Sequence, residues 1–184
     1  ESIKKIDKNF GKNNSLKNQK IIIEYTDPNI LKEFHIGHLM SNSIGESLSR
    51  IFEFSEAKIK RICYQSDVGL GIAKAIWGKI EKPDLSWQNS YVFGTKSYDE
   101  NESFKKEIIE LNKKIFDRND KNVNKIYDEG KKWSLDHFDE FYKKLGTKFD
   151  YFIFESEISD FGKKIVEDNL KKGIFEKCEK GAII

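Results

Sequence analysis

The order of a strand, a helix and a second strand near the start of the chain is the feature that most restricts its fold. Residues 20–25, KIIIEY, form a β-branched run without polar alternation until its end, which is typical of a strand buried on both faces of a parallel sheet. Turn-forming residues follow, and from Ile36 to Phe54 apolar residues recur at spacings of three and four, as on one stripe of an amphipathic helix. Residues 59–64 predict the second strand. These segments predict a right-handed, parallel βαβ unit and hence an α/β fold.

The middle of the chain has a different character. A glycine-bearing loop at residues 66–71 leads into a predicted helix that extends to Trp77. Residues 81–101 contain a proline and scattered Asn, Ser and Asp, so a loop is predicted there. Two helical patterns then fill residues 102–145. This part is predicted to be an α-helical insertion that interrupts the sheet.

After Gly146 the pattern of an α/β domain returns. A strand is predicted at residues 149–154 and a helix from Phe161 to Leu170, and residues 181–184 have the pattern of a strand cut off in mid-course. We therefore divide the chain into four parts. Residues 1–19 are a linker or loop, and residues 20–80 are the first half of an α/β domain. Residues 81–146 are a mainly helical insertion, and residues 147–184 return to the α/β domain, which is truncated at its C-terminus.

Composition excludes some classes of protein and leaves others open. The 33 basic and 31 acidic side chains give a net charge of +2, so a nucleic-acid binder would need its basic residues to segregate in space. The two cysteines, Cys63 and Cys178, match no metal-ligand spacing and are expected to be reduced thiols that serve as small apolar fillers. No apolar run approaches the ~20 residues of a membrane span, and the N-terminus lacks a signal-peptide core, so a cytoplasmic location is expected.

The stretch PNILKEFHIGHLM, residues 28–40, places His35 and His38 at the predicted start of the helix. The first backbone N–H groups of a helix have no partner, and the helix dipole adds roughly half a positive charge there, so phosphate groups bind readily. Both imidazoles can donate hydrogen bonds to phosphate oxygens. Gly37 removes a side chain, so that a flat group such as a purine could lie against the backbone, and Lys32 adds a mobile cation. The pattern predicts a site for a polyanion.

A metal site is the main alternative for the two histidines. Residues at i and i+3 could form half of one, but zinc would need a third ligand, and the only local candidates are Glu33 and Glu46. We expect no bound metal. The pattern H-x-G-H also arises by chance, and it gains weight here because it follows a predicted buried strand and a Pro-Asn turn.

Residues 21–54, IIIEYTDPNILKEFHIGHLMSNSIGESLSRIFEF, resemble the first nucleotide-binding segment of class I aminoacyl-tRNA synthetases, whose signature reads HIGH. The flanking residues resemble the arginyl-tRNA synthetase family in particular, which has a Glu-Tyr-Ser/Thr-x-Pro-Asn turn, then a lysine, then the histidine signature. The resemblance continues in SDVGLG (66–71), FYKKLGTKFD (141–150), ES (155–156) and the Gly-Ala pair near the end. Taken together, these matches are far more specific than the four-residue signature.

The resemblance implies a fold, a reaction and roles for several residues. Residues 20–80 would be the first half of a Rossmann-like, ATP-binding catalytic domain of the HIGH-signature nucleotidyl transferase type. The arginine carboxylate would attack the α-phosphorus of ATP, with Mg2+ carried by the nucleotide, and the aminoacyl group would pass to tRNA(Arg). His35 and His38 would contact the ATP phosphates, and Gly37 would make room for adenine. Lys32 would serve the phosphates, because the second signature of many class I enzymes, KMSK, is absent here; an ordinary solvated lysine is the alternative.

The resemblance also implies a site for the amino acid. Glu24 and Asn29 would help to hold arginine near its α-amino and carboxylate ends, with Thr26 close by. A strand-end carboxylate in solvent, or one paired with a lysine, is the alternative for Glu24. In the family, the residues that grip the guanidinium group lie downstream of Ile184, as does the anticodon-binding domain. The resemblance therefore implies a catalytic-domain fragment that is inactive by itself and a full-length enzyme that is a monomer.

Two other readings of the function stay open on the sequence alone. One is a different class I synthetase or a small HIGH-type nucleotidyltransferase, which would use ATP at the same strand-to-helix corner. The other is a non-catalytic, synthetase-like ATP-binding module, against which the retained histidines and Lys32 count. The basic residues of the helical insertion could contact the acceptor end of tRNA, or could form a solvated helix face diluted by acidic neighbours.

Overall fold

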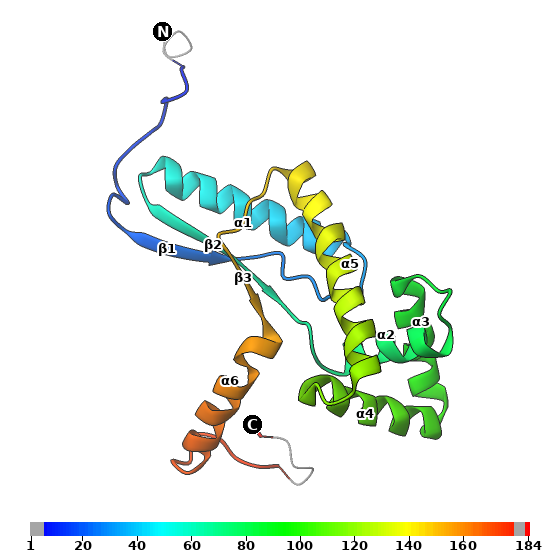
Figure 1. Ribbon diagram of the computed structural model, residues 1–184. Coiled ribbons are helices and arrows are strands. Elements are labelled where there is room, and N and C mark those ends of the chain that lie inside the picture. Colours follow the sequence, from blue (N-terminus) through cyan, green and yellow to red (C-terminus); the bar gives the residue numbers. More distant parts are fainter. Residues whose placement is uncertain (1–5, 179–182) are drawn as a thin grey trace.

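The computed structural model describes residues 6–178 and 183–184. Residues 6–19 form turns, without a helix or strand. Three strands and six helices follow within the described residues (Figure 1). In chain order they are β1 (Lys20–Glu24), α1 (Ile36–Phe54), β2 (Lys58–Gln65), α2 (Leu70–Glu81), α3 (Trp87–Glu100), α4 (Glu102–Asp117), α5 (Lys121–Leu145), β3 (Tyr151–Phe154) and α6 (Glu155–Leu170).

The three strands form one parallel sheet in the order β1-β2-β3. Lys20 is paired with Lys58 at the start of β1, and Ile62 is paired with Tyr151 at the start of β3. Helix α1 connects β1 to β2 and runs beside the sheet, while α2 to α5 lie between β2 and β3 in the chain (Figure 1). The predicted βαβ unit, the parallel sheet and the helical insertion are confirmed.

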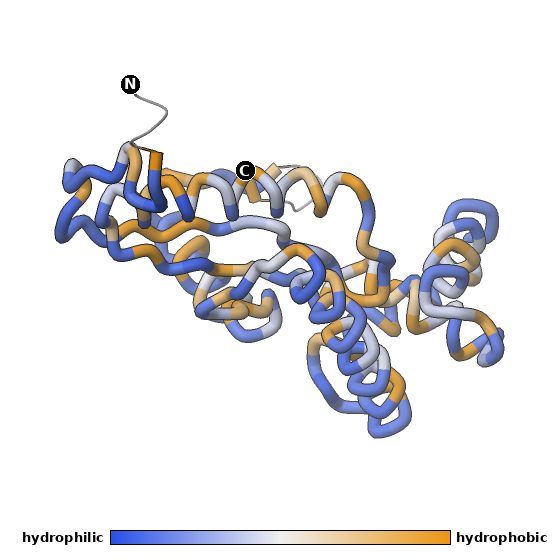
Figure 2. The backbone as a smooth tube through the Cα atoms, turned by 90° about the horizontal axis from the view of Figure 1, so that it is seen from above, coloured by the Kyte–Doolittle hydropathy of each residue, from blue (hydrophilic) through white to orange (hydrophobic). Residues whose placement is uncertain are grey.

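The apolar interior falls into two groups. The first, here called the helical cluster, lies among α2, α4, the start of α5 and the loop after β1, and along these helices hydrophilic and hydrophobic segments alternate (Figure 2). Its buried members are Ile30, Leu31, Val68, Ile72, Ala73, Ala75, Ile76, Trp77, Ile108, Leu111, Ile115, Val123 and Tyr127. The second, the sheet cluster, joins the sheet to the C-terminal half of α5 and consists of Tyr25, Cys63, Phe138, Tyr142 and Phe149.

Both cysteines are free thiols, as expected. Cys63 is fully buried in the sheet cluster, and burial raises the pKa of its thiol to about 12. A thiol with so high a pKa stays protonated and behaves as a small apolar side chain.

The predicted loop at 81–101 is wrong, because helix α3 occupies Trp87–Glu100. Ser86 caps this helix by accepting a hydrogen bond from the Asn89 N–H at 3.2 Å. Small residues then let α3 approach α2 closely: a Cβ added to Gly94 would collide with the carbonyl of Lys74, and one added to Gly78 would collide with that of Ser90. The small and polar residues that suggested a loop allow this close packing of two helices instead.

The C-terminal part also begins differently from the prediction. Helix α6 starts at Glu155, directly after β3, and not near Phe161. Of the strand predicted at residues 181–184, the first two residues lie outside the described residues, and Ile183 forms an isolated antiparallel bridge with Lys177.

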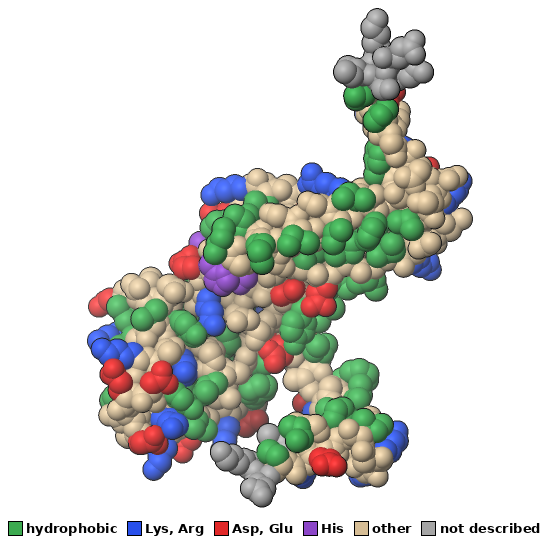
Figure 3. Space-filling model, turned by 180° about the vertical axis from the view of Figure 1, so that it is seen from behind, with side chains coloured by type: hydrophobic (Ala, Val, Ile, Leu, Met, Phe, Trp, Pro, Cys, Tyr) green, Lys and Arg blue, Asp and Glu red, His purple; other side chains and the backbone are tan. Residues whose placement is uncertain are grey.

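One face of the sheet is open, which corrects the prediction that β1 is buried on both faces. Residues alternate along β1, with Ile21 and Ile23 half-buried and Ile22 66% exposed. The apolar stripe of α1 is also open to solvent, and hydrophobic side chains line this helix beside the histidines (Figure 3). The exposed members of this α1 stripe are Ile36, Met40, Ile44, Leu48 and Ile51. The buried positions of α1 are instead Asn42, Gly45, Glu46 and Ser49.

Candidate functional site

The two predicted histidines form the first turn of α1. His35 is the residue that caps the helix, and its Nδ1 accepts a hydrogen bond from the backbone N–H of Gly37 at 3.1 Å. His38 reaches back, and its Nδ1 accepts from the backbone N–H of His35 at 3.3 Å. The imidazole rings stack with centroids 3.7 Å apart and planes inclined by 16°. Two histidines thus make the reciprocal capping arrangement that Ser or Thr and Glu or Gln make in the usual capping box.

These hydrogen bonds determine which nitrogen of each ring can donate. A ring nitrogen that accepts a hydrogen bond carries no proton, so the proton of each neutral imidazole is on Nε2. Burial, followed by the charges of His35 and Lys32, lowers the pKa of His38 to about 4. His38 is therefore neutral at pH 7, and its Nε2–H remains available as a donor.

The turn that precedes the helix has an unusual backbone. Thr26, Asp27 and Leu31 have φ values of 81°, 48° and 63°, in the left-handed region that β-branched residues such as threonine rarely adopt. Side chains of α1 hold this turn in place: Ser41 Oγ accepts from the Thr26 N–H at 3.0 Å, and Asn42 Nδ2 donates to Thr26 Oγ1 at 3.0 Å. Strained backbone supported in this way is common at binding sites.

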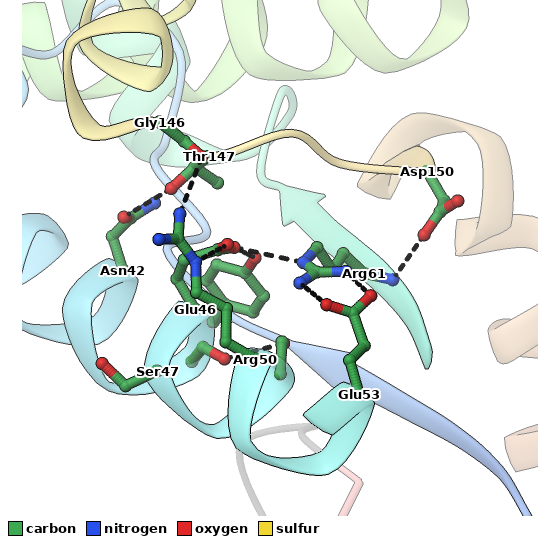
Figure 4. Close-up of polar contacts among 12 residues, drawn as sticks. Asn42, Glu46, Ser47, Arg50, Glu53, Arg61, Gly146, Thr147 and Asp150 are labelled. Atoms are coloured by element: carbon green, nitrogen blue, oxygen red, sulfur yellow. Dashed lines mark hydrogen bonds and ion pairs between the residues drawn. The ribbon is translucent and has the colours of Figure 1, made fainter. Parts of the chain in front are cut away.

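Asn42 connects α1 to the loop after α5, and the neighbouring Glu46 connects α1 to Arg61 of β2 (Figure 4). Asn42 Oδ1 accepts from Thr147 Oγ1 at 2.8 Å. Glu46, which the sequence offered as a metal ligand, accepts from Tyr25 Oη at 2.6 Å, from Arg50 Nε at 2.7 Å and from Arg61 Nε at 3.1 Å. Burial raises the pKa of Glu46, but these donors outweigh it and the net shift is downward. Its carboxylate is fully engaged in holding α1 on the sheet.

The other metal candidate, Glu33, is also engaged. His137 Nε2 of α5 lies 2.8 Å from its carboxylate. Within residues 6–178 and 183–184, no group of three or more His, Cys, Asp or Glu side chains is arranged to hold a metal ion.

The predicted arginine-binding residues lie at and after the C-terminal end of β1. Glu24 is the last residue of the strand and is exposed, Thr26 is 4% exposed, and Asn29 is half-buried. In the described part of the chain, no hydrogen bond joins the side chains of Glu24 or Asn29 to the histidine pair. The structure thus places the charge of Lys32 near enough to act on His38, and it leaves Glu24 and Asn29 at the same edge of the sheet without a hydrogen bond to the pair among the described residues.

Sequence reasoning missed Asp27, which lies in the same turn. Its Oδ1 accepts from the Tyr64 N–H of β2 at 2.7 Å. Burial raises the pKa of Asp27 to about 6, the Tyr64 N–H opposes the rise, and the charge of Glu24 adds to it. Two carboxyl groups that repel each other at the sheet edge favour a cationic ligand between them. An acidic residue directly before the Pro-Asn turn was the feature of the sequence that could have pointed to Asp27.

The SDVGLG loop has a structural role. Asp67 is fully buried and accepts hydrogen bonds from Tyr127 Oη at 2.8 Å, Lys131 Nζ at 2.7 Å, and Ser156 N and Oγ at 2.8 and 2.7 Å. Ser66 Oγ donates to Glu155 Oε2 at 2.5 Å. Two motifs that are far apart in the sequence, at 66–71 and 155–156, therefore meet in space.

Comparisons with known proteins agree with this geometry. A family model described as "tRNA synthetases class I (R), catalytic domain" matches residues 2–184. The chain belongs to this family of class I arginyl-tRNA synthetases. Within it, an "Arginine--tRNA ligase" of Borrelia garinii subsp. bavariensis is 37% identical over 186 residues, which cover 95% of this chain and 32% of that protein. One of Treponema denticola is 30% identical over an alignment of 198 positions, which covers 100% of this chain and 33% of the relative.

Solved arginyl-tRNA synthetases have the same fold. The enzyme of Plasmodium falciparum matches with a TM-score of 0.66 and 26% identity, covering 92% of this chain and 30% of that one. The Thermus thermophilus enzyme matches with a TM-score of 0.62 at 20% identity, covering 84% of this chain and 26% of that one, which supports the fold alone. The chain spans about a third of the length of the curated relatives that it matches. The resemblance to arginyl-tRNA synthetases and the Rossmann-like α/β fold are confirmed.

The basic residues of the helical insertion are largely paired in this member of the family. Lys105 contacts Glu102 at 3.0 Å, Lys114 contacts Asp120 at 3.2 Å, and Arg118 contacts Asp128 at 2.7 Å. These pairs fit the solvated helix face better than a basic patch for tRNA. None of the helices in the described part of the chain combines the length and apolar character needed to span a bilayer.

Proposed function

We propose that the protein containing this chain is an arginine–tRNA ligase, which activates arginine with ATP and transfers it to tRNA(Arg). The observation that carries the proposal is the stacked pair His35 and His38, whose Nε2–H groups are free to donate at the start of α1. Family membership supports arginine as the amino acid. Because the chain spans about a third of its relatives, the whole reaction is assigned to a protein of family length.

In this proposal the first turn of α1 binds the triphosphate of ATP. His35 and His38 donate to phosphate oxygens, Lys32 adds a positive charge, and Mg2+ arrives with the nucleotide. Gly37 leaves the surface bare for the adenine ring, and a Cβ there would lie only 3.0 Å from His35 Cε1. A side chain at position 37 would therefore push the His35 ring out of the stack as well as block the base.

The amino acid binds beside the nucleotide, at the end of β1. Glu24, Thr26 and Asn29 hold the α-amino and carboxylate ends of arginine, and Asp27 adds a second carboxylate to this edge. The carboxylate of arginine then attacks the α-phosphorus, the bond from that phosphorus to the bridging oxygen breaks, and pyrophosphate leaves. Negative charge builds on the phosphate oxygens, where the Nε2–H donors and the Lys32 ammonium stabilise it. A terminal ribose hydroxyl of tRNA(Arg) next takes the arginyl group, and AMP is released.

The remaining properties follow from the same assignment. The enzyme acts as a monomer in the cytoplasm, and it needs no resident metal besides the Mg2+ of its nucleotide. The His35–His38 arrangement supports a catalytic enzyme over a module that only binds ATP, because both donors point away from the helix backbone that they cap.

Arginine-dependent exchange of pyrophosphate into ATP, with tRNA present, tests the function. In a protein of family length that contains this chain, we expect exchange with arginine and with no other amino acid. His38→Ala should lower the rate at least about tenfold, because a donor to the developing charge is lost. Lys96→Ala, on the exposed face of α3, is the matched control and should leave exchange unchanged. A loss below tenfold for His38→Ala would remove the phosphate-binding role from this residue.

A further inference from the structure

The direction of the Lys32 side chain is set by a residue of the helical insertion. The Lys32 ammonium lies 4.4 Å from the centroid of the Tyr91 ring, on α3. A lysine has a flexible four-carbon stem, so an ammonium on a loop without a partner would sample many directions. The face of an aromatic ring attracts a cation at this distance and restricts that freedom.

The partner is an aromatic ring, and no carboxylate competes with it. In the described part of the chain, Lys32 takes part in no ion pair, whereas Lys131, Lys114 and Lys132 each contact an aspartate. A carboxylate would neutralise the charge of Lys32 and occupy its N–H groups. An aromatic side chain holds the ammonium without neutralising its charge, which stays available to an anion. Burial raises the pKa of the Tyr91 hydroxyl, but Lys32 lowers it and the net shift is downward, so the hydroxyl also faces this ammonium.

Both sides of the contact are anchored. On the loop, the Leu31 N–H donates to Ser134 Oγ of α5 at 2.8 Å, and the Glu33 N–H donates to Gln88 Oε1 of α3 at 3.2 Å. The backbone of the residue between them therefore cannot drift. On the helix, Tyr91 directly follows Ser90, which is fully buried where α3 packs against α2.

The first turn of helix α2 lies beside the contact between Lys32 and Tyr91. A Cβ added to Gly71 would lie 3.9 Å from Tyr91 Cε2 and 4.0 Å from Lys32 Nζ, so the ring, the ammonium and the first turn of α2 converge. Further along the loop, the ring of Phe34 contacts that of His38, at 5.3 Å between centroids, and that of Phe141 of α5, at 4.6 Å. The helical insertion thus holds the loop from Lys32 to His38 at both ends.

We propose that Tyr91 is a positioning residue, whose ring holds the Lys32 ammonium beside the histidine pair so that the phosphate site is formed before ATP arrives. The proposal rests on the proposed function and adds a residue to it. It gives the helical insertion a part in ATP binding, because α3 carries the ring and α5 carries Ser134 and Phe141. Preorganisation of this kind lowers the entropy that binding must overcome.

The test uses the protein of family length and a double-mutant cycle with Tyr91→Leu and Lys32→Ala. Tyr91→Leu keeps apolar bulk but removes the ring, and we expect kcat/KM for ATP in arginine-dependent pyrophosphate exchange to fall about three- to tenfold. KM for arginine should change less than twofold. In the Lys32→Ala background, Tyr91→Leu should have no further effect. Tyr91→Phe, which keeps the ring, should restore activity to within twofold of the wild type.

Several outcomes would overturn the proposal while leaving the proposed function intact. The first is full activity of Tyr91→Leu, and the second is an equal loss of kcat/KM from Tyr91→Leu in the wild-type and Lys32→Ala backgrounds. The third is a loss of kcat/KM in Tyr91→Phe as large as in Tyr91→Leu, which would assign the effect to the hydroxyl. A wild-type protein without arginine-dependent exchange would instead refute the proposed function.

A measurement on the wild-type protein covers the case in which Tyr91→Leu does not fold. After methylation of lysines with 13C-formaldehyde, the Lys32 signal, assigned with Lys32→Arg, should be shifted upfield of those of exposed lysines by the ring of Tyr91. A Lys32 signal at the position of exposed lysines would overturn the proposal by itself.

Discussion

Ile76 of α2 and Ile44 of α1 both belong to apolar stripes of amphipathic helices, but Ile76 is 0% exposed and Ile44 is 54% exposed. The helical cluster around Ile76 surrounds its apolar side chains with other helices. Helix α1 places Asn42, Gly45 and Glu46 toward the rest of the described chain and turns its isoleucines to solvent. A contiguous exposed apolar stripe of this kind is typical of a surface that another structure covers. The comparison shows that one amphipathic helix can carry two contact faces, a polar one and an apolar one.

Removal of Asp67 should have the largest effect on stability, because this residue joins the helical cluster to the C-terminal helix. It lies in the loop after β2 and accepts from Tyr127 and Lys131 of α5 and from Ser156 of α6. We expect Asp67→Ala to lower the free energy of unfolding by about 3–5 kcal/mol, since it leaves the donors of a buried network unpaired. Asp128→Ala, which removes an exposed partner of Arg118, should cost less than about 1 kcal/mol. Denaturant unfolding measures both, and equal costs would show that the buried network of Asp67 does not hold α5 and α6 together.

The two isoleucines provide a direct test of the comparison. Ile76→Ala should lower the free energy of unfolding by about 2–5 kcal/mol, because it opens a cavity in the helical cluster. Ile44→Ala should change it by no more than about 0.5 kcal/mol, because solvent already surrounds the side chain. In the 184-residue chain, Ile44→Lys should also reduce the fluorescence of a dye that binds exposed apolar surface. A similar cost for the two alanine variants would mean that the α1 stripe is covered in solution.

Local patterns were enough to predict most of the elements. The run KIIIEY and the three-and-four spacing from Ile36 to Phe54 correspond to β1 and α1 within one residue. Helix α3 was missed because its signal is tertiary: Gly94 is favourable there only because the backbone of α2 approaches it. The burial of β1 was overestimated for a related reason, since a β-branched run does not reveal how many faces of its strand are covered.

The candidate site shows the same division between local and distant information. His35, Gly37 and His38 could be predicted because their roles depend on neighbours within one turn of a helix. The donors to Glu46 could not, because they come from β2, from the residue after β1 and from the next turn of α1. Tyr91 could not be linked to Lys32 while its own segment was predicted to be a loop.

Gln65 is expected to have an effect of the opposite sign, because its replacement should stabilise the region of the sheet. Its side chain is fully buried, and among residues 6–178 and 183–184 its amide oxygen and nitrogen have no hydrogen-bond partner within bonding geometry. It lines a cavity of about 270 Å3 with Phe138, Tyr142 and Phe154. We expect Gln65→Leu to raise the free energy of unfolding by about 1–2 kcal/mol, since an unsatisfied buried amide is replaced by an apolar group. Gln19→Leu, at an exposed position, is the control. A loss of stability in Gln65→Leu would show that the cavity supplies a partner to the amide.

The smallest expected effect concerns Asp27 and appears only in the dependence of stability on pH. The folded protein raises the pKa of this carboxyl group from 3.8 to about 6, so the folded state holds the proton more tightly than the unfolded state does. The contribution of Asp27 to stability is therefore greatest below pH 4 and is lost as the pH rises from 4 to 6. Asp27→Asn removes this dependence.

The unfolding free energies of the variant and the wild type should diverge between pH 4 and pH 6. The variant gains stability relative to the wild type until the difference becomes constant above pH 6. Asp84→Asn, at an exposed loop position, should follow the wild type at every pH. A difference that is the same at pH 4 and pH 7 would mean that the folded protein does not raise the pKa of Asp27, and that burial and the charge of Glu24 do not act on this carboxyl group as described.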